Sequence, residues 1–166
     1  MVYLSPYLSF RSNCRDVLDF YQSCLSGELE LMRFGDSPAA SHLPPEAHDQ
    51  IMHGTLTTKN FVLMASNADG IGKPLHTGNN VSLSLHFDND AEIDAAFARL
   101  GEGGTVVDPL KDMYWGGKFG SLTDRFGISW LFNFQRIAGE QAIFTLSHAV
   151  FYEPETRTHS RARRRY

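Results

Sequence analysis

Histidine and aromatic side chains on short predicted strands are the residues of this chain that could do chemistry. His53 lies in the predicted strand 51–57, and an imidazole there could act as a general base, anchor a polar ligand group or bind a metal. It could equally be half-buried and hydrogen-bonded to a backbone carbonyl or a serine. The residues that we expect to line a binding cup beside it are Met64, Ser82, Ser84, His86, Trp115, Phe119 and Trp130.

The aromatic candidates have two interpretations. Met64, Trp115, Phe119 and Trp130 could line an apolar cup suited to a planar or aromatic ligand. Met64 and Trp130 could instead pack in the core. Trp115 lies in a glycine-containing loop, where a large aromatic is typical of a lid or an interface.

Several other chemistries are disfavoured because their motifs are missing from the sequence. There is no Gly-x-Ser-x-Gly elbow, no phosphate-binding loop and no Cys-x-x-Cys pair. A serine hydrolase, an NTPase and a zinc ribbon are therefore poor interpretations. No glycine-rich strand-to-helix turn precedes an acidic ribose-binding residue, so a methyltransferase that uses a nucleoside cofactor is not indicated either.

The elements that must position the candidate residues occur twice along the chain. Each copy reads as a strand, an amphipathic helix and three further strands, because apolar residues alternate in the strands and recur at helical spacing in the helices. Asn13 or Ser12 could cap the first helix and Asp90 the second, and Gly27 is a natural stop. A proline-containing loop of about 15 residues interrupts the first copy and could serve as a lid or a dimer arm.

The domain organisation follows from these copies. We expect a first β-α-β-β-β module at 1–66, a linker at 67–80, a second module at 81–135 and an atypical basic extension at 136–166. If each strand packs its apolar face on its helix, the polar face turns the other way, and two curved sheets could form a cup between the modules. The predicted class is therefore α+β. A strand or short helix is conceivable at 143–152.

Composition limits the compartment and the partners. No apolar run approaches the roughly 20 residues needed to cross a bilayer, and residues 1–6 do not resemble a signal peptide. Cys14 and Cys24 fall on one predicted helix about 15 Å apart, too far for a disulfide, so we expect reduced thiols and a cytoplasmic location. Residues 136–166 hold six Arg and three Glu, so the net charge of −4 leaves −7 on the body. An acidic body argues against nucleic acid as the main partner.

An ordered set of short motifs resembles the vicinal oxygen chelate superfamily of glyoxalases, extradiol dioxygenases and bleomycin-resistance proteins, and within it the PhnB-like branch. The motifs cover about residues 3–135. They are Pro6-Tyr7-Leu8-Ser9-Phe10, Asn13-Cys14, Phe20-Tyr21, Phe34-Gly35-Asp36, Ile51-Met52-His53, Leu63-Met64-Ala65-Ser66, Ser82-Leu83-Ser84-Leu85, Trp115-Gly116, Phe119-Gly120 and the run from Leu122 to Trp130. The resemblance implies paired modules that form a cup, and a homodimer, because modules of this superfamily often exchange or abut across a two-fold axis.

The resemblance also implies four metal-ligand positions, two in each module. They fall near Ser5 or Pro6, at His53, near Ser82, and at Trp130 or Leu131, so only His53 is a competent ligand. A transition metal normally takes three or more protein ligands, so we expect no strong metal site. His86 and the His, Asp and Glu residues of the long loop could substitute, which leaves a divalent metal open as a cofactor.

Two functional classes remain from the sequence. The favoured one is a protein that binds a small hydrophobic or aromatic molecule in the cup between the modules without a strong metal site. The alternative is a metal-dependent lyase, isomerase or dioxygenase that uses His53 with non-standard ligands. An interaction module driven by the arginine-rich extension is a third and weaker hypothesis.

Overall fold

The structure is a computed structural model that describes residues 2–38, 40–67 and 75–135. All described residues belong to one compact unit. The strand or helix expected at 143–152 lies outside the described residues. No helix of the described part is both long and apolar enough to cross a membrane.

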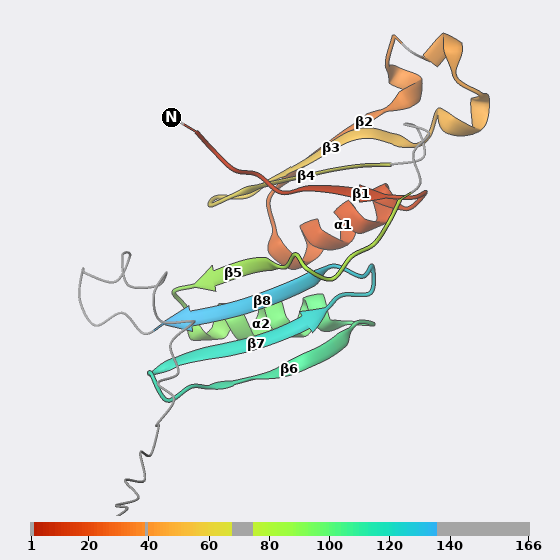
Figure 1. The fold of residues 1–166 in the computed structure, drawn as a ribbon. Coiled ribbons are helices and arrows are strands. Elements are labelled where there is room, and N and C mark those ends of the chain that lie inside the picture. Colours follow the sequence, from red (N-terminus) through yellow and green to blue (C-terminus); the bar gives the residue numbers. More distant parts are fainter. Residues whose placement is uncertain (1, 39, 68–74, 136–166) are drawn as a thin grey trace, which may run out of the picture. The chain divides into compact units, whose positions relative to one another are not determined.

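The first module is a helix packed on one side of a four-stranded sheet (Figure 1). The strand order is β1-β4-β3-β2, with β1 parallel to β4 and the other pairs antiparallel. The elements are β1 (Tyr7–Phe10), α1 (Cys14–Leu25), β2 (Glu28–Arg33), β3 (Ile51–Thr57) and β4 (Val62–Asn67). The sequence predicted this β-α-β-β-β order.

The second module repeats the arrangement with the order β5-β8-β7-β6. Its elements are β5 (Leu83–Phe87), α2 (Asp90–Gly101), β6 (Thr105–Asp112), β7 (Gly117–Thr123) and β8 (Ser129–Gln135). The sequence indicated a short strand at 105–107, but β6 continues for eight residues. Its pairing with β7 shifts register twice, and these irregularities hide the alternation on which strand prediction depends.

The helix ends follow local chemistry. Gly27 ends the α1 region at φ +117°, and a Cβ there would lie 2.6 Å from the carbonyl oxygen of Thr57, so only glycine fits. The cap expected at Asp90 is wrong. The side chain of Asn89 caps α2 instead and accepts hydrogen bonds from the backbone N–H groups of Ala91 and Glu92. Asn13 occupies the N-cap of α1, but its side chain makes no capping hydrogen bond.

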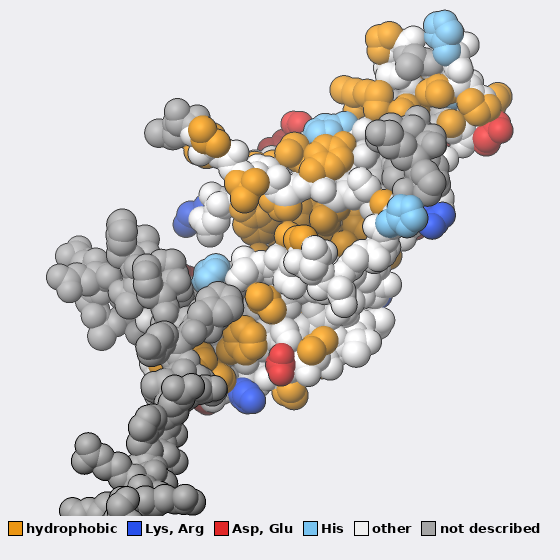
Figure 2. All heavy atoms as spheres, in the orientation of Figure 1, with side chains coloured by type: hydrophobic (Ala, Val, Ile, Leu, Met, Phe, Trp, Pro, Cys, Tyr) orange, Lys and Arg blue, Asp and Glu red, His pale blue; other side chains and the backbone are white. Residues whose placement is uncertain are grey.

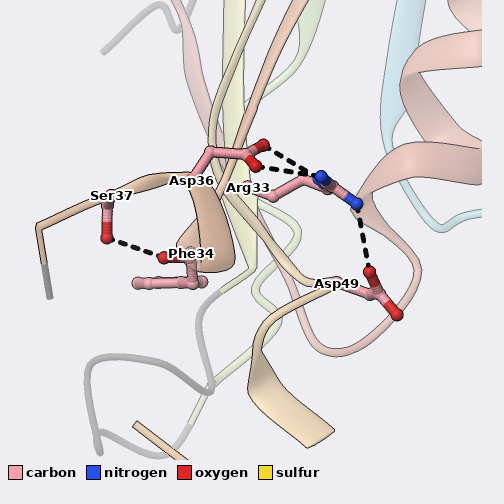
Figure 3. A network of polar contacts seen from close by, with 5 residues as sticks. All are labelled: Arg33, Phe34, Asp36, Ser37 and Asp49. Atoms are coloured by element: carbon pink, nitrogen blue, oxygen red, sulfur yellow. Dashed lines mark hydrogen bonds and ion pairs between the residues drawn. The ribbon is translucent and has the colours of Figure 1, made fainter. Parts of the chain in front are cut away.

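The long loop expected to be without structure is in fact organised. Three 3₁₀ turns fill it, η1 (Phe34–Asp36), η2 (Ala40–His42) and η3 (Pro45–Ala47). The guanidinium of Arg33 joins the two ends of the loop, because it donates to both carboxylate oxygens of Asp36 at 2.9 Å and to Asp49 at 3.3 Å (Figure 3). The hydrogen bond from Arg33 lowers the pKa of the Asp36 carboxyl. These ion pairs are exposed, so they set the geometry of the loop more than its stability.

One hydrophobic core serves both modules. Its buried members come from α1, α2 and both sheets, and they form a single cluster that includes Cys14, Tyr21, Leu100, Trp130 and Phe132. Both cysteines are free and buried, as expected, and burial raises the pKa of the Cys14 thiol to about 12. The two modules therefore share one hydrophobic core and are not two independently packed domains.

A buried carboxylate lies where the modules meet. Asp124, in the turn between β7 and β8, accepts hydrogen bonds from the Tyr21 hydroxyl at 2.6 Å and from Trp130 Nε1 at 2.8 Å. It also accepts the backbone N–H groups of Phe126 and Ile128 at 2.8 and 3.0 Å. Because Tyr21 belongs to α1, this carboxylate ties the helix of the first module to a turn of the second.

We expect Tyr21→Phe to lower the free energy of unfolding by about 1.5–3 kcal/mol, the usual value of a hydrogen bond to a charged group. The substitution keeps the ring packed against Trp130 and removes only the hydroxyl donor to Asp124. Urea denaturation measures the effect. Tyr114→Phe, at an exposed hydroxyl, is the matched control and should change stability by less than about 0.5 kcal/mol. Equal stability of Tyr21→Phe and wild type would show that the hydrogen bond from Tyr21 to Asp124 does not stabilise the fold.

Candidate functional site

Each sheet has one side covered by its helix and one side that we call its open face. On the first sheet the register sets Tyr7 beside Met64, Met64 beside Thr55 and Thr55 beside Glu30, so these four side chains form a row across the open face. Leu63, Ala65 and Leu56 point the other way and are buried under α1. The alternation in the sequence therefore separates a core side from a side available to a ligand.

His53 lies on the open face of the first sheet and both of its ring nitrogens have a hydroxyl partner. The Thr55 Oγ1 atom lies 3.1 Å from Nε2, and the Tyr7 hydroxyl lies 3.4 Å from Nδ1, which is a long hydrogen bond. The Tyr7 and His53 rings lie 5.8 Å apart at an interplanar angle of 34°. The imidazole is half-buried, and its partners are a threonine and a tyrosine, not the backbone carbonyl or serine considered from the sequence.

The open face of the second sheet carries a separate polar group. Asn133 Nδ2 donates to the Ser84 hydroxyl at 3.0 Å, and that hydroxyl lies 3.2 Å from Nε2 of His86. The Ser84 hydroxyl therefore links Asn133 to His86. Phe119 pairs with Asn133 across β7 and β8 and adds an apolar surface to this face.

The remaining predicted site residues lie elsewhere. Trp130 is 1% exposed and belongs to the core, where its indole donates to Asp124, so a ligand on the open face cannot touch it. Trp115 is 51% exposed in the β6–β7 turn and packs edge-on against Tyr114. Ser82 is exposed just before β5 begins. Met64 lies in the first open face, next to Tyr7 and Thr55.

The predicted site residues thus fall into three sets. Met64 lies beside the partners of His53, Ser84 and Phe119 lie with His86, and Ser82, Trp115 and Trp130 belong to neither the His53 group nor the His86 group. Each open face lies on the side of its sheet away from the helix, and both helices contribute to the common core, so both faces turn away from that core. Within residues 2–38, 40–67 and 75–135, no hydrogen bond or ring contact joins the two groups.

Three residues of these groups were missed by sequence reasoning, namely Tyr7, Thr55 and Asn133. Tyr7 and Thr55 fall at alternating positions of correctly predicted strands, so periodicity could have predicted to which side of the sheet each side chain points. The proximity of Thr55 to His53 follows from the same period, because the two residues lie two positions apart on β3. The proximity of Tyr7 to His53 could not be predicted, because it depends on which strands pair and in which register.

Ligating side chains do not gather in the described part of the chain. None of its His, Cys, Asp and Glu residues form a group of three or more that could hold a metal ion. His53 is the one family ligand position with a competent side chain, and a metal there would have to displace a hydroxyl from a ring nitrogen.

Comparisons with known proteins relate this chain to one family. The model of the family described as 3-demethylubiquinone-9 3-methyltransferase matches residues 3–132. The crystal structure of protein PA1353 from Pseudomonas aeruginosa shares 38% identity with a TM-score of 0.73, covering 82% of this chain and all of that one.

Two further solved structures share the fold at lower identity. One is a putative 3-demethylubiquinone-9 3-methyltransferase, PhnB protein, from Bacillus cereus (22% identity, TM-score 0.64, 80% of this chain and 99% of that one). The other is a glyoxalase/bleomycin resistance protein/dioxygenase family enzyme from Burkholderia phytofirmans (14% identity, TM-score 0.52, 78% and 95%). The matched family, together with two four-stranded sheets built from β-α-β-β-β modules, shows that this chain belongs to the PhnB-like branch of the vicinal oxygen chelate superfamily.

Proposed function

We propose that this protein binds a small, partly aromatic or hydrophobic molecule against its open faces, with His53 as the polar anchor. The observation that supports this most is the imidazole held between the hydroxyls of Tyr7 and Thr55 on an accessible sheet surface. The Thr55 hydroxyl at 3.1 Å restricts rotation of the ring, so little entropy is lost when a polar ligand group replaces the longer Tyr7 contact at Nδ1.

The surroundings of His53 suit a ligand that is apolar over most of its surface. Met64 lies half-exposed in the neighbouring row, and Met32, which pairs with His53 across β2 and β3, is 49% exposed. Thioethers adapt to flat ligands and make favourable contacts with aromatic rings. The Tyr7 ring adds an aromatic wall beside the imidazole. One polar anchor among apolar groups is the usual composition of a small-molecule site.

The proposed site is completed by a second copy of the chain. Because both open faces turn away from the shared core, a ligand on one face of a single chain stays exposed to water on its other side. A homodimer in which the first sheet of one protomer meets the second sheet of its partner would bring the His53 group opposite a His86 group. It would thereby make the cup from two chains.

Anchoring by His53 predicts that His53→Gln weakens binding at least tenfold, about 1.4 kcal/mol, because the imidazole hydrogen bond to the ligand is lost. Hits from a thermal-shift screen of small aromatic compounds supply the ligands, and calorimetry measures their affinity. His42→Gln, on the exposed loop, is the control and should bind like wild type. Equal affinity of His53→Gln and wild type at unchanged thermal stability would refute the anchor.

The two-copy cup predicts a molecular mass of twice 18.6 kDa in solution. Light scattering coupled to gel filtration measures it, across a range of protein concentrations with and without a screening hit. A monomer that binds the same hit with full affinity would show that one chain suffices.

A second candidate function is a metal-dependent lyase, isomerase or dioxygenase that uses His53 with non-standard ligands. What favours it is His53 at a ligand position of the superfamily, in the fold of a glyoxalase/bleomycin resistance protein/dioxygenase family enzyme. A divalent metal would supply Lewis-acid polarisation of a substrate oxygen there.

Elemental analysis of protein purified without chelator separates the two functions. The metal-dependent function predicts near one equivalent of a single divalent metal per chain, lost on His53→Ala. The favoured function predicts only trace metal, even after incubation with Zn, Ni, Mn or Fe ions, because the described residues hold no group of three or more His, Cys, Asp or Glu side chains that could bind one.

A further inference from the structure

A groove of about 480 Å³ lies away from the His86 group, along the unpaired edge of β1. One wall is the β1 segment 7–11, and the opposite wall combines segment 75–78, Val81 and Leu83 with the turn 126–129. Figure 2 shows a hollow at this place between β1 and β5, with hydrophobic side chains at its base. Its volume is within the range of small-molecule sites.

The groove differs in charge from the rest of the molecule. The whole chain has 19 acidic and 15 basic residues, yet no Asp or Glu is among the described residues that line this groove. Its ionisable lining side chains are Arg11, His76 and Tyr7. The lining of this groove has a guanidinium and no described carboxylate. The groove therefore favours an anion, although the protein as a whole is acidic.

The polar groups of the groove retain hydrogen-bonding capacity. Among the described residues, the Arg11 guanidinium donates only to the Leu75 carbonyl, at 3.5 Å from Nη2, so most of its five N–H donors remain for a ligand. Asn13 lines the same groove, and its amide makes no capping hydrogen bond to α1. Arg11 presents a planar fork that matches a carboxylate or sulfonate group.

The rest of the lining is apolar. Leu75, Val81, Leu83 and Ile128 line the groove together with the ring of Phe126. Val81 is 73% exposed, so its side chain is available to contact a ligand. An apolar trough with a cationic group at one place fits a molecule with an apolar body and one anionic group.

We propose that this groove is a second binding site, distinct from the open faces, and that it takes a small organic anion with an aromatic or aliphatic body. Arg11 pairs with the anionic group, and the apolar lining covers the body. Tyr7 lines the groove and also contacts His53, so it is the one residue shared with the proposed anchor.

Two fluorescent probes with nearly the same body test the proposal on the full chain. 1-Anilinonaphthalene-8-sulfonate carries an anionic group, and N-phenyl-1-naphthylamine lacks it. We expect saturable binding of both, tighter for the sulfonate. Arg11→Gln should weaken the sulfonate at least tenfold and the neutral probe less than twofold, because only the sulfonate uses the guanidinium. Arg15→Gln, at an exposed α1 position outside the groove, is the matched control and should change neither.

A second variant guards against an indirect effect of the first. Ser129→Glu places a carboxylate in the groove and should repel the sulfonate while the neutral probe still binds. Unchanged sulfonate affinity in Arg11→Gln, or an equal loss for both probes, would overturn the proposal. His53→Gln separates this site from the proposed anchor. Sulfonate binding that depends on His53 and not on Arg11 would place the anion on the open face and refute the groove site alone.

Discussion

The structure depends on one buried carboxylate, that of Asp124. A carboxylate without water is costly unless hydrogen-bond donors replace its solvent, and here four donors do so. Two are backbone N–H groups that shape the β7–β8 turn, one is the indole of Trp130 in β8, and one is the hydroxyl of Tyr21 in α1. Because the donors come from both modules, the carboxylate is satisfied only when the helix of the first module lies against the second. Arg125, next in the chain, reinforces this junction by stacking on Phe20 at 4.4 Å.

This junction determines where ligands can bind. Each helix covers one side of its sheet and contributes to the common core, so the opposite sides, with His53 and His86, face outward. Polar side chains on these faces pair with one another, as His53 does with Thr55 and Ser84 with Asn133. Because these polar side chains have hydrogen-bond partners, placing them on the sheet costs little free energy. Their donors and acceptors stay oriented at an accessible surface. The fold itself hosts many activities, so the chemistry has to be argued from these side chains.

The open faces and the groove differ in physical character. The His53 surface is amphiphilic, with an imidazole and two hydroxyls between thioethers and an aromatic ring. The groove beside β1 combines an apolar trough with a guanidinium and has no acidic side chain in its described lining. The proposed His53 site would select ligands by hydrogen bonding and shape, and the proposed groove site would select them by charge as well. Salt should therefore weaken ligands of the groove more than ligands of the open face.

The sequence by itself determined the local elements of this protein. Periodicity predicted both modules, the buried face of α1 and the stop at Gly27, and the ordered motifs indicated the family, because these depend on neighbours in the chain. The predicted cap of α2 was wrong by one residue, because Asn89 and Asp90 are adjacent and both are good N-cap residues. Tertiary structure alone decided that Tyr7 lies beside His53, that Asp124 accepts hydrogen bonds from both Tyr21 and Trp130, and that Arg11 lies in a groove free of described carboxylates. Those contacts join residues up to 103 positions apart, and strand register and module packing, which no local pattern encodes, bring them together.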